Sequence, residues 1–333
     1  MSDLPITVIL PYFQAERTIK RAIKSILKQT FTKFELLLID NRSTDNGPKI
    51  AQQMAQTDSR IRLLFEEEQG VVFAMNKGLI EARGKFIARM DADDVALPER
   101  LEKQYAFLLK NPEIGLVGSN VRHVSDLSSQ GLQRFVNWVN AFHSAEAIWT
   151  NRFVEIPLIQ PSVLFRADLH QKYGLYRNGD FPEDYELFLR WLDAGVRFYQ
   201  LPEVLHEWHD STSRLTRTDS RYSQDAFYRT KAQYFAKWFK RTERDKALWI
   251  WGAGRRSRQR ARLLEQQGLQ ISGYYDLKSR QSKQVTCLSY QEIPKPGIQF
   301  ILSMVGNYGA REKITNFLQE RNYQAGNGFL LMA

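Results

Sequence analysis

Three aspartates in four positions follow an apolar run in the segment "FIARMDADDVALPERL", residues 86–101. Alternate residues of an extended segment point the same way, so Asp91 and Asp93 can converge while Ala92 faces elsewhere. Like charges this close repel each other unless a cation lies between them. Convergent carboxylates suit Mg²⁺ or Mn²⁺, which prefer oxygen ligands and share their coordination with substrate phosphates. The alternative is an ordinary acidic turn, because Asp is a common turn and capping residue.

A second acidic pair, Glu183 and Asp184, lies near the start of "FPEDYELFLRWLDAG". Pro182 suits the first turn of a helix and Gly195 suits its end, with apolar residues at helical spacing between them. Asp184 would then lie in the first turn, where the helix dipole favours an ionised carboxylate. A general base must be ionised at working pH. The pattern favours Asp184 as a base, with Glu183 as the second choice and helix capping without chemistry as the alternative.

The first hundred residues alternate short apolar runs with amphipathic segments. The pattern predicts strands at 6–10, 34–40, 61–65 and 85–90, and helices near 19–27, 48–56 and 75–82. Strands separated by helices indicate right-handed crossovers and a mostly parallel sheet covered on both faces. In such sheets, ligands bind at the carboxyl ends of the strands, which is where Asp40 and Asp91 fall. The predicted class is α/β, with the acidic turn at the binding edge.

The overall composition is that of a soluble globular protein. The 333 residues favour two domains, and 43% hydrophobic and 25% charged residues are ordinary values. A single cysteine, Cys287, excludes a disulfide framework. The N-terminus has no basic segment ahead of its apolar run, so no signal peptide is expected. No run reaches the ~18 apolar residues of a spanning helix, so we expect a soluble or surface-attached protein in the cytoplasm.

Four segments together resemble family 2 inverting glycosyltransferases with the GT-A fold. They are "ITVILPYFQAERTIKRAIKSILKQTFTKFELLLIDNRSTDNG", "GVVFAMNKGLIEARGKFIARMDADDVALPERL", "IQPSVLFRADL" and "FPEDYELFLRWLDAG". They occur in the family's order and cover residues 5–215. The resemblance implies transfer of a sugar from a nucleotide-diphospho-sugar, most simply a UDP-sugar, to a hydroxyl of a glycan or lipid-linked acceptor in cell-surface polysaccharide biosynthesis. The Gln-x-x-Arg-Trp signature of processive members is absent, which favours transfer of a single sugar.

The resemblance places the nucleoside at the first two strands. Pro11 and Tyr12, in the loop after the first strand, and Asp40 and Asn41, in the turn after the second, would hold it. Many members have a second aspartate where this chain has Asn41. A side-chain amide both donates and accepts, so the identity of the nucleobase stays open. Met75 stands where the family usually has an arginine, which removes one phosphate contact.

The resemblance places the diphosphate and its metal at the acidic turn. Asp91 and Asp93 would bind Mg²⁺ or Mn²⁺, and Ala92 would line the donor site. The segment "LHEWHDSTSRLT" matches the family's loop that closes over the diphosphate. In that loop His209 could ligate the metal and Arg214 could contact phosphate. The alternative for each is a solvated surface residue.

The implied reaction is a single in-line displacement. Asp184 matches the family's general base, and Glu183 beside it would contact the substrate. Asp184 would take the proton of the acceptor hydroxyl as its oxygen attacks the anomeric carbon, while the metal offsets charge on the departing diphosphate. No nucleophilic side chain is needed.

The last ninety residues form a separate unit. Gly252 and Gly254 follow an apolar run, precede a helix and are followed about 20 residues later by Asp276, as in a dinucleotide-binding fingerprint. Ser257 replaces the third glycine, so an anion site and a docking domain both remain open. This unit supports two rival functions, a nucleotide-binding oxidoreductase and a non-catalytic scaffold. The predicted divisions are a GT-A domain at 1–218, a basic helical linker at 219–244 and a small Rossmann-like domain at 245–333.

The net charge of +10 comes from one region. Residues 229–262 contain twelve Lys or Arg and two acids, so the rest of the chain is near neutral. Within 220–241, Phe227, Tyr234, Phe235 and Trp238 recur near helical spacing among lysines. A basic helix with an aromatic face predicts peripheral attachment to an anionic membrane, here the inner face of the cell membrane. The alternative is that the aromatics pack between the domains; no nucleic-acid motif accompanies the charge, so no nucleic-acid partner is expected.

Overall fold

The computed structural model describes residues 4–125, 130–210, 219–281, 286–307 and 309–333. They divide into two compact units. The first unit comprises Met1–Ile148, Leu158–Gly179 and Glu183–Asp219, and the second comprises Trp149–Pro157, Asp180–Pro182 and Ser220–Ala333. The helix that we expected to be a linker is thus grouped with the second unit.

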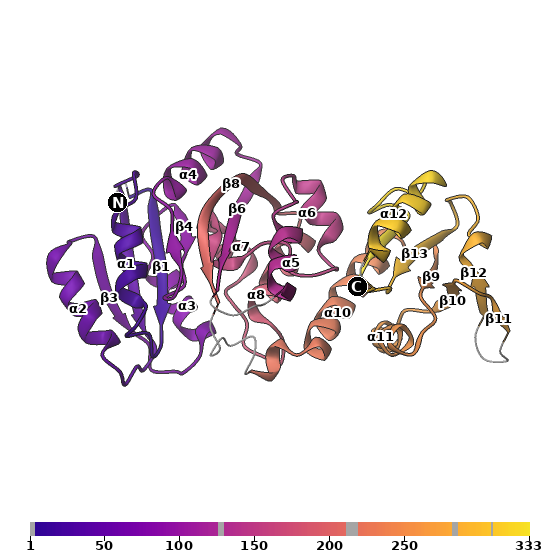
Figure 1. Ribbon diagram of the computed structural model, residues 1–333, viewed down its shortest axis with the longest axis horizontal. Helices are drawn as coiled ribbons and strands as arrows, with labels where there is room; N and C mark the ends of the chain where they lie inside the picture. Colours follow the sequence, from indigo (N-terminus) through magenta and orange to yellow (C-terminus); the bar gives the residue numbers. More distant parts are fainter. Residues whose placement is uncertain (1–3, 126–129, 211–218, 282–285, 308) are drawn as a thin grey trace. The chain divides into compact units, whose positions relative to one another are not determined.

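The first unit is built on a mixed, mostly parallel sheet, drawn in indigo to salmon in Figure 1. Its strand order is β3-β2-β1-β4-β7-β6-β8-β5. The first four strands in this order are parallel, as are β6 and β8, whereas β7 and β5 run antiparallel to their neighbours. This confirms the predicted α/β class. The strands are β1 (Ile6–Tyr12), β2 (Phe34–Asp40), β3 (Ile61–Phe65), β4 (Phe86–Arg89), β5 (Val95–Ala96), β6 (Ile114–Val124), β7 (Leu164–Arg166) and β8 (Arg197–His209).

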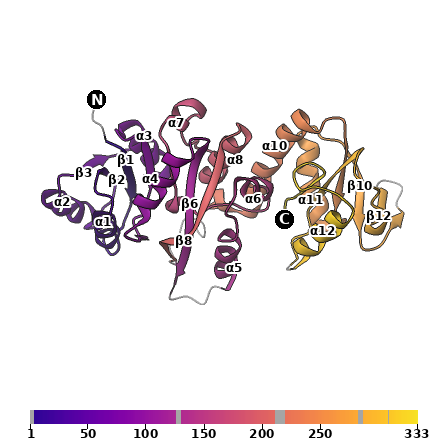
Figure 2. The same ribbon diagram turned by 90° about the horizontal axis from the view of Figure 1, so that it is seen from above.

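Helices cover both faces of this sheet. Seen from above, α1 and α2 lie on one side of β1–β3 and α3 lies on the other (Figure 2). Gly78 lets α3 approach closely, because a Cβ there would come within 2.6 Å of Ile9 Cγ2. The helices are α1 (Ile19–Leu27), α2 (Gly47–Thr57), α3 (Val71–Glu81), α4 (Arg100–Lys110), α5 (Gln130–Val139), α6 (Ala145–Asn151), α7 (Asp168–Tyr173) and α8 (Glu183–Asp193), with a 3-10 turn η1 at Gln160–Ser162.

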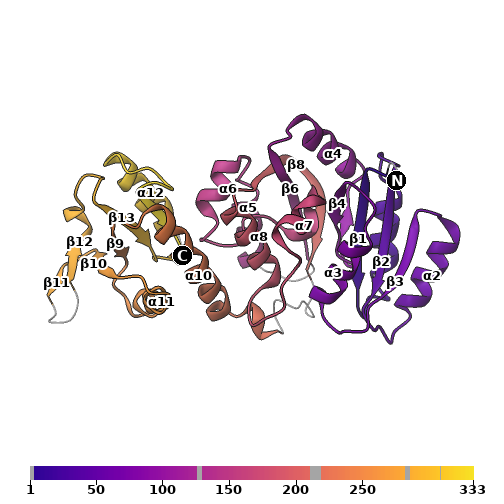
Figure 3. The same ribbon diagram turned by 180° about the vertical axis from the view of Figure 1, so that it is seen from behind.

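The second unit has its own parallel sheet, with α11 and α12 on its two sides (Figure 3). Its strand order is β11-β12-β10-β9-β13-β14, and only the β11–β12 pair is antiparallel among the described strands. The elements are η2 (Ser220–Tyr222), α10 (Gln224–Thr242), β9 (Ala247–Trp251), α11 (Arg255–Gln266), β10 (Ile271–Asp276), β11 (Arg280–Gln281), β12 (Thr286–Ser289), η3 (Tyr290–Glu292), β13 (Gln299–Ser303), α12 (Ala310–Glu320) and β14 (Phe329–Leu331).

The aromatic face of α10 is buried within the second unit. The rings of Phe235, Trp238 and Phe239 lie 5.5–6.1 Å from the ring of Phe300 in β13. We had predicted that these rings enter a membrane interface. They instead stabilise the unit's core and are not available for that role. Lys240 is also structural, because its Nζ donates to the carbonyl of Gln267 at the end of α11, at 2.6 Å. Within the described ranges, no helix has the length and apolar character needed to cross a bilayer.

The glycine-rich turn between β9 and α11 is packed and hydrogen-bonded by the protein's own residues. Gly252 has φ +114°, and a Cβ there would come within 2.8 Å of Ser257 Oγ, so both glycine and the small Ser257 are required. Asp276, expected to be available for a ligand, accepts from the backbone N–H of Ala253 at 3.0 Å and of Leu277 at 2.7 Å. Its carboxylate therefore stabilises the turn.

Candidate active site

The carboxyl ends of β1, β2 and β4 meet at one edge of the first sheet. Tyr12 pairs with Asp40 in register, and the N–H of Met90 donates to the carbonyl of Ile9 at 3.0 Å. The acidic turn after β4 therefore begins beside the end of β1. Tyr12 is buried, and this burial, followed by the charges of Asp40 and Asp45, raises the pKa of its hydroxyl, which stays protonated.

Three carboxylates converge in the acidic turn. Asp91, Asp93 and Asp94 each contribute one oxygen to a group whose members lie within 4.8 Å of one another. Asp91 and Asp93 are half-buried, whereas Asp94 is only 1% exposed. Carboxylate oxygens are hard ligands, so the group fits Mg²⁺ or Mn²⁺. The sequence prediction named the first two residues, and the structure adds Asp94.

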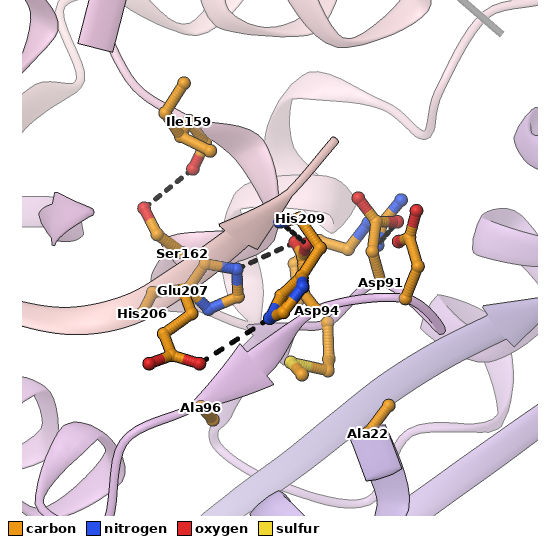
Figure 4. Close-up of polar contacts among 12 residues, drawn as sticks. Ala22, Asp91, Asp94, Ala96, Ile159, Ser162, His206, Glu207 and His209 are labelled. Atoms are coloured by element: carbon orange, nitrogen blue, oxygen red, sulfur yellow. Dashed lines mark hydrogen bonds and ion pairs between the residues drawn. The ribbon is translucent and has the colours of Figure 1, made fainter. Parts of the chain in front are cut away.

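Asp94 is held by strand β8. His206 Nε2 lies 2.8 Å from Asp94 Oδ2, and the backbone N–H of His209 donates to Asp94 Oδ1 at 2.8 Å (Figure 4). Both oxygens of this buried carboxylate are thus engaged by the protein. Asp94 therefore anchors the turn, while Asp91 and Asp93 present their oxygens at its more open side.

Arg100 completes this buried anchor. Its NH1 lies 3.1 Å from His206 Nδ1, and its NH2 donates to the carbonyl of Arg89 at 2.7 Å. Burial, and next the charge of Arg100, hold the pKa of His206 well below its usual range, so the ring is neutral. Since Arg100 can only donate, Nδ1 accepts and Nε2 carries the proton that bonds Asp94. Burial lowers the pKa of Arg100 to about 9, which still leaves it charged at neutral pH.

His209 does not join the three aspartates. Its ring Nε2 lies 3.5 Å from Glu207 Oε2, and Figure 4 shows the ring directed toward that carboxylate. Among the described residues, the group of convergent metal-binding atoms contains aspartates alone. The predicted metal ligand His209 thus contributes its backbone N–H to Asp94. Arg214 lies outside the described residues.

Asn41 is used by the protein itself. Its Nδ2 donates to the carbonyls of Glu66, at 3.2 Å, and Glu68, at 2.7 Å, and its Oδ1 accepts from the N–H of Gly70 at 2.7 Å. The amide therefore fixes the loop that leads into α3, where we had expected it to contact the nucleoside. Asp40 is half-buried and accepts from the N–H of Ser43 at 3.0 Å, so it remains at the edge of the sheet.

Two further predicted positions are fully packed. Pro11 is buried within β1, and Met75 is 0% exposed in α3. Met75 therefore belongs to the core and makes no contact that an arginine would have made in the site.

Asp184 is the second residue of α8 and accepts from the N–H of Tyr185 at 2.7 Å. Burial, and next the neighbouring Glu183 carboxylate, raise the pKa of Asp184 above its usual range. This direction is opposite to the one expected from the helix dipole alone, because desolvation outweighs the dipole here. Arg190 fixes the helix, since its NH2 donates to the carbonyl of Leu175 at 2.7 Å.

Arg89 acts on both the acidic turn and Asp184. Its NH1 donates to Asp91 Oδ1, and its positive charge acts against the rise in the pKa of Asp184. The charge of one buried guanidinium thus acts on two carboxylates that are 93 positions apart in the sequence. Neither Arg89 nor the Arg100–His206 pair was singled out by the sequence, because an isolated Arg or His carries no signal of burial.

Comparisons with known proteins agree with this geometry. The profile of Glycosyl transferase family 2 matches residues 7–174. The O-antigen biosynthesis glycosyltransferase WbnJ of Escherichia coli is 28% identical over 235 residues, covering 67% of this chain and 86% of WbnJ. A shorter match, 41% over 112 residues, covers 33% of this chain and 44% of the E. coli UDP-Glc:alpha-D-GlcNAc-diphosphoundecaprenol beta-1,3-glucosyltransferase WfgD. The mannosyltransferase PcManGT of Pyrobaculum calidifontis, solved with GDP-Man and Mn²⁺, superposes with a TM-score of 0.51 at 20% identity, covering 72% of this chain and 64% of PcManGT.

Proposed function

Because the chain belongs to glycosyltransferase family 2, we propose that it moves one sugar from a UDP-sugar to a hydroxyl of a lipid-linked glycan, with inversion and with Mg²⁺ or Mn²⁺. The observation that carries the proposal is the group of three aspartates at the strand edge, where Arg89 donates to Asp91 and its charge also acts on Asp184. A metal-binding group and a candidate base in one site are what this reaction needs.

The names of similar proteins support the donor, the metal and the acceptor. WfgD is described as using UDP-Glc and a diphosphoundecaprenol-linked acceptor, and PcManGT was solved with a nucleotide-sugar and Mn²⁺. WbnJ is described as acting in O-antigen biosynthesis. We extend these features to this chain and place the reaction at the cytoplasmic face of the cell membrane.

Each group of site residues has its own role in the proposed reaction. Asp91 and Asp93 would hold the metal, and Asp94 keeps their turn in place. The metal, when bound, supplies positive charge to the departing diphosphate. Tyr12 and Asp40 lie beside the turn and would position the nucleoside. Asp184 would accept the proton of the attacking hydroxyl, and a raised pKa makes it a stronger base than an ordinary aspartate.

The second unit offers weaker support for the rival functions. A nicotinamide-dependent oxidoreductase would use the carboxylate of Asp276, but that group is bound to the backbone of its own turn. A non-catalytic scaffold would not require convergent aspartates together with Asp184. The profile match, residues 7–174, falls mostly in the first unit, which favours the transferase.

The test is Asp93→Ala, measured beside Asp245→Ala, whose side chain is 92% exposed in the second unit. We expect wild type and the control to bind UDP only with Mn²⁺, and to release sugar from at least one member of a nucleotide-sugar screen. The Asp93 variant should lose both the metal-dependent UDP binding, measured by calorimetry, and turnover. Full activity of this variant in the presence of a chelator would overturn the metal assignment.

A further inference from the structure

Arg89 is a buried guanidinium that the protein does not satisfy. It is the last residue of β4, two positions before Asp91, and is 3% exposed. Its NH1 donates to Asp91 Oδ1, which is the one acceptor recorded for this side chain among the described residues. Its Nε is buried and has no hydrogen-bond partner in the described part of the chain. A guanidinium has five N–H donors, and one of them, the buried Nε–H, is thus left without an acceptor among the described residues.

Leaving such a group unpaired is costly. A buried donor without an acceptor costs about 1–3 kcal/mol, and more when it is charged. Natural proteins retain unsatisfied buried groups chiefly where they serve a site. The surroundings of Arg89 are those of the site, since Asp91, Tyr176 and Asp94 are the groups whose charges act on it. The tyrosine hydroxyl already accepts from Gln160 Nε2 at 2.8 Å.

The charge of the site indicates which ligand would satisfy Arg89. A divalent ion on Asp91 would compete with Arg89 for the same carboxylate and would place two cations side by side. Such an arrangement is stable only if an anion lies between them. A diphosphate has oxygens for both, and planar guanidinium groups bind phosphate oxygens in pairs.

We propose that Arg89 is a substrate-binding residue whose guanidinium, with its unpartnered Nε–H, binds the diphosphate of the donor. It would share the negative charge of that group with the metal and release its hold on Asp91 when the metal and donor bind together. This inference rests on the proposed function, because it requires a nucleotide-diphosphate donor.

Arg89→Met tests the inference, with Arg21→Met as the matched control. Arg21 is exposed and donates to the backbone carbonyl of Asp93 at 2.5 Å, so it contacts the same turn without a buried, unsatisfied guanidinium. Mn²⁺ alone is titrated by electron paramagnetic resonance, and UDP, UMP and pyrophosphate are titrated with Mn²⁺ by calorimetry. Circular dichroism and thermal unfolding report whether each variant is folded.

We expect Arg89→Met to bind Mn²⁺ alone at least as tightly as wild type, because a competing cation has been removed from Asp91. The same variant should bind UDP and pyrophosphate with Mn²⁺ at least about 10-fold more weakly, with a smaller effect on UMP. Arg89→Lys should recover part of the loss, because it keeps the charge but not the planar fork. Arg21→Met should stay within about 2-fold of wild type in every titration.

Four results would overturn the inference; the last two need a UDP-sugar and GDP in the same titrations. UDP binding as tight as in wild type would show that Arg89 does not contact the diphosphate. Equally weakened binding of Mn²⁺ alone, UMP and UDP would show that Arg89 supports folding. Weaker binding of a UDP-sugar with unchanged affinity for UDP would show that Arg89 contacts the sugar. If wild type bound UDP, GDP and pyrophosphate not at all, the proposed function would fall, and this inference with it.

Discussion

His206 and Asp94 are hydrogen-bonded at 2.8 Å although 112 positions separate them in the sequence. Both side chains are essentially inaccessible to solvent, and Arg100 bonds the opposite edge of the imidazole. This pair joins β8 to the acidic turn and so fixes the orientation of the proposed metal ligands. It is a structural support of the kind on which metal sites depend.

His206→Phe should therefore weaken both stability and metal-dependent UDP binding. The ring volume is kept, but Asp94 and Arg100 lose their shared partner in the core. We expect a loss of about 1–3 kcal/mol or more in the free energy of unfolding, because the buried Asp94 carboxylate loses a hydrogen-bond donor, and roughly 10-fold weaker Mn²⁺-dependent UDP binding. His209→Ala is the control, because its contact with Asp94 comes from the backbone. A large loss of Mn²⁺ affinity in that control would instead restore His209 as a ligand.

Asp184→Asn should separate catalysis from binding. The amide keeps the shape of the side chain but cannot take a proton, so we expect kcat to fall by about 10²-fold or more with nearly unchanged UDP affinity. Because burial raises the pKa of Asp184, activity of wild type should decline with falling pH earlier than for an ordinary aspartate base. Steady-state kinetics over a range of pH values measure the kcat of the variant and the pH dependence of wild-type activity. An equal loss of donor affinity would mark Asp184 as a binding residue.

Lys231 should make the stability of wild type depend on alkaline pH. This lysine is 2% exposed, its Nζ donates to the carbonyl of Val154 at 2.7 Å, and burial lowers its pKa to about 8. In the unfolded chain the pKa is about 10.4, so between these values only the unfolded state holds the proton. The free energy of unfolding of wild type should therefore rise with pH in that interval, by up to about 1.4 kcal/mol per pH unit.

Lys231→Met lacks this titration, so its stability advantage over wild type should shrink as the pH rises from 8 to 10. Below pH 8 the difference should be constant. Urea unfolding at several pH values gives the comparison, with Lys237→Met as an exposed control on the same helix. A difference that does not change with pH would show that burial does not lower the pKa of Lys231 below that of the unfolded chain.

We predict that the protein attaches to anionic membranes through α11. The aromatic face of α10 is buried, but α11 carries exposed arginines, and each basic residue near an anionic surface contributes about 1 kcal/mol. Wild type should sediment with anionic vesicles at low salt and detach at high salt. Replacing Arg255, Arg256 and Arg258 together by Glu should abolish binding to the vesicles. The same replacement of the exposed Lys20 and Lys24 of α1 and of Lys28, which caps that helix, should not. No sedimentation of wild type would refute the membrane role.

The strands were the most predictable part of this protein. β2 and β3 have the predicted bounds, and β1 and β4 differ from prediction only at their ends, because short apolar runs between turn residues specify buried strands. The helix at α3 begins at Val71, four residues before the predicted start, since the helix follows Gly70 directly. Helix ends are set by local caps and packing, which the apolar period does not report.

The site was predictable where chemistry is local. Neighbouring aspartates at a strand end predict Asp91 and Asp93 as metal ligands, and the structure brings their oxygens together; the acidic start of a helix predicts Asp184 as a base, which stays a prediction. The roles of Asn41 and His209 were not predictable, because an amide or an imidazole acts on whichever group the fold brings to it. Here those groups are the backbone of the loop before α3 and the carboxylate of Glu207.

The sequence by itself determined the α/β class, the position of the acidic turn at a strand edge and a basic region in the second half of the chain. Each is a property of residues close together in the sequence, where periodicity and charge act directly. Only the tertiary structure decided that Arg89 is buried and donates to Asp91, that His206 holds Asp94, and that the aromatic face of α10 is core. Burial and pairing arise between distant segments, and these set the protonation and the unmet hydrogen bonds on which the proposed chemistry depends.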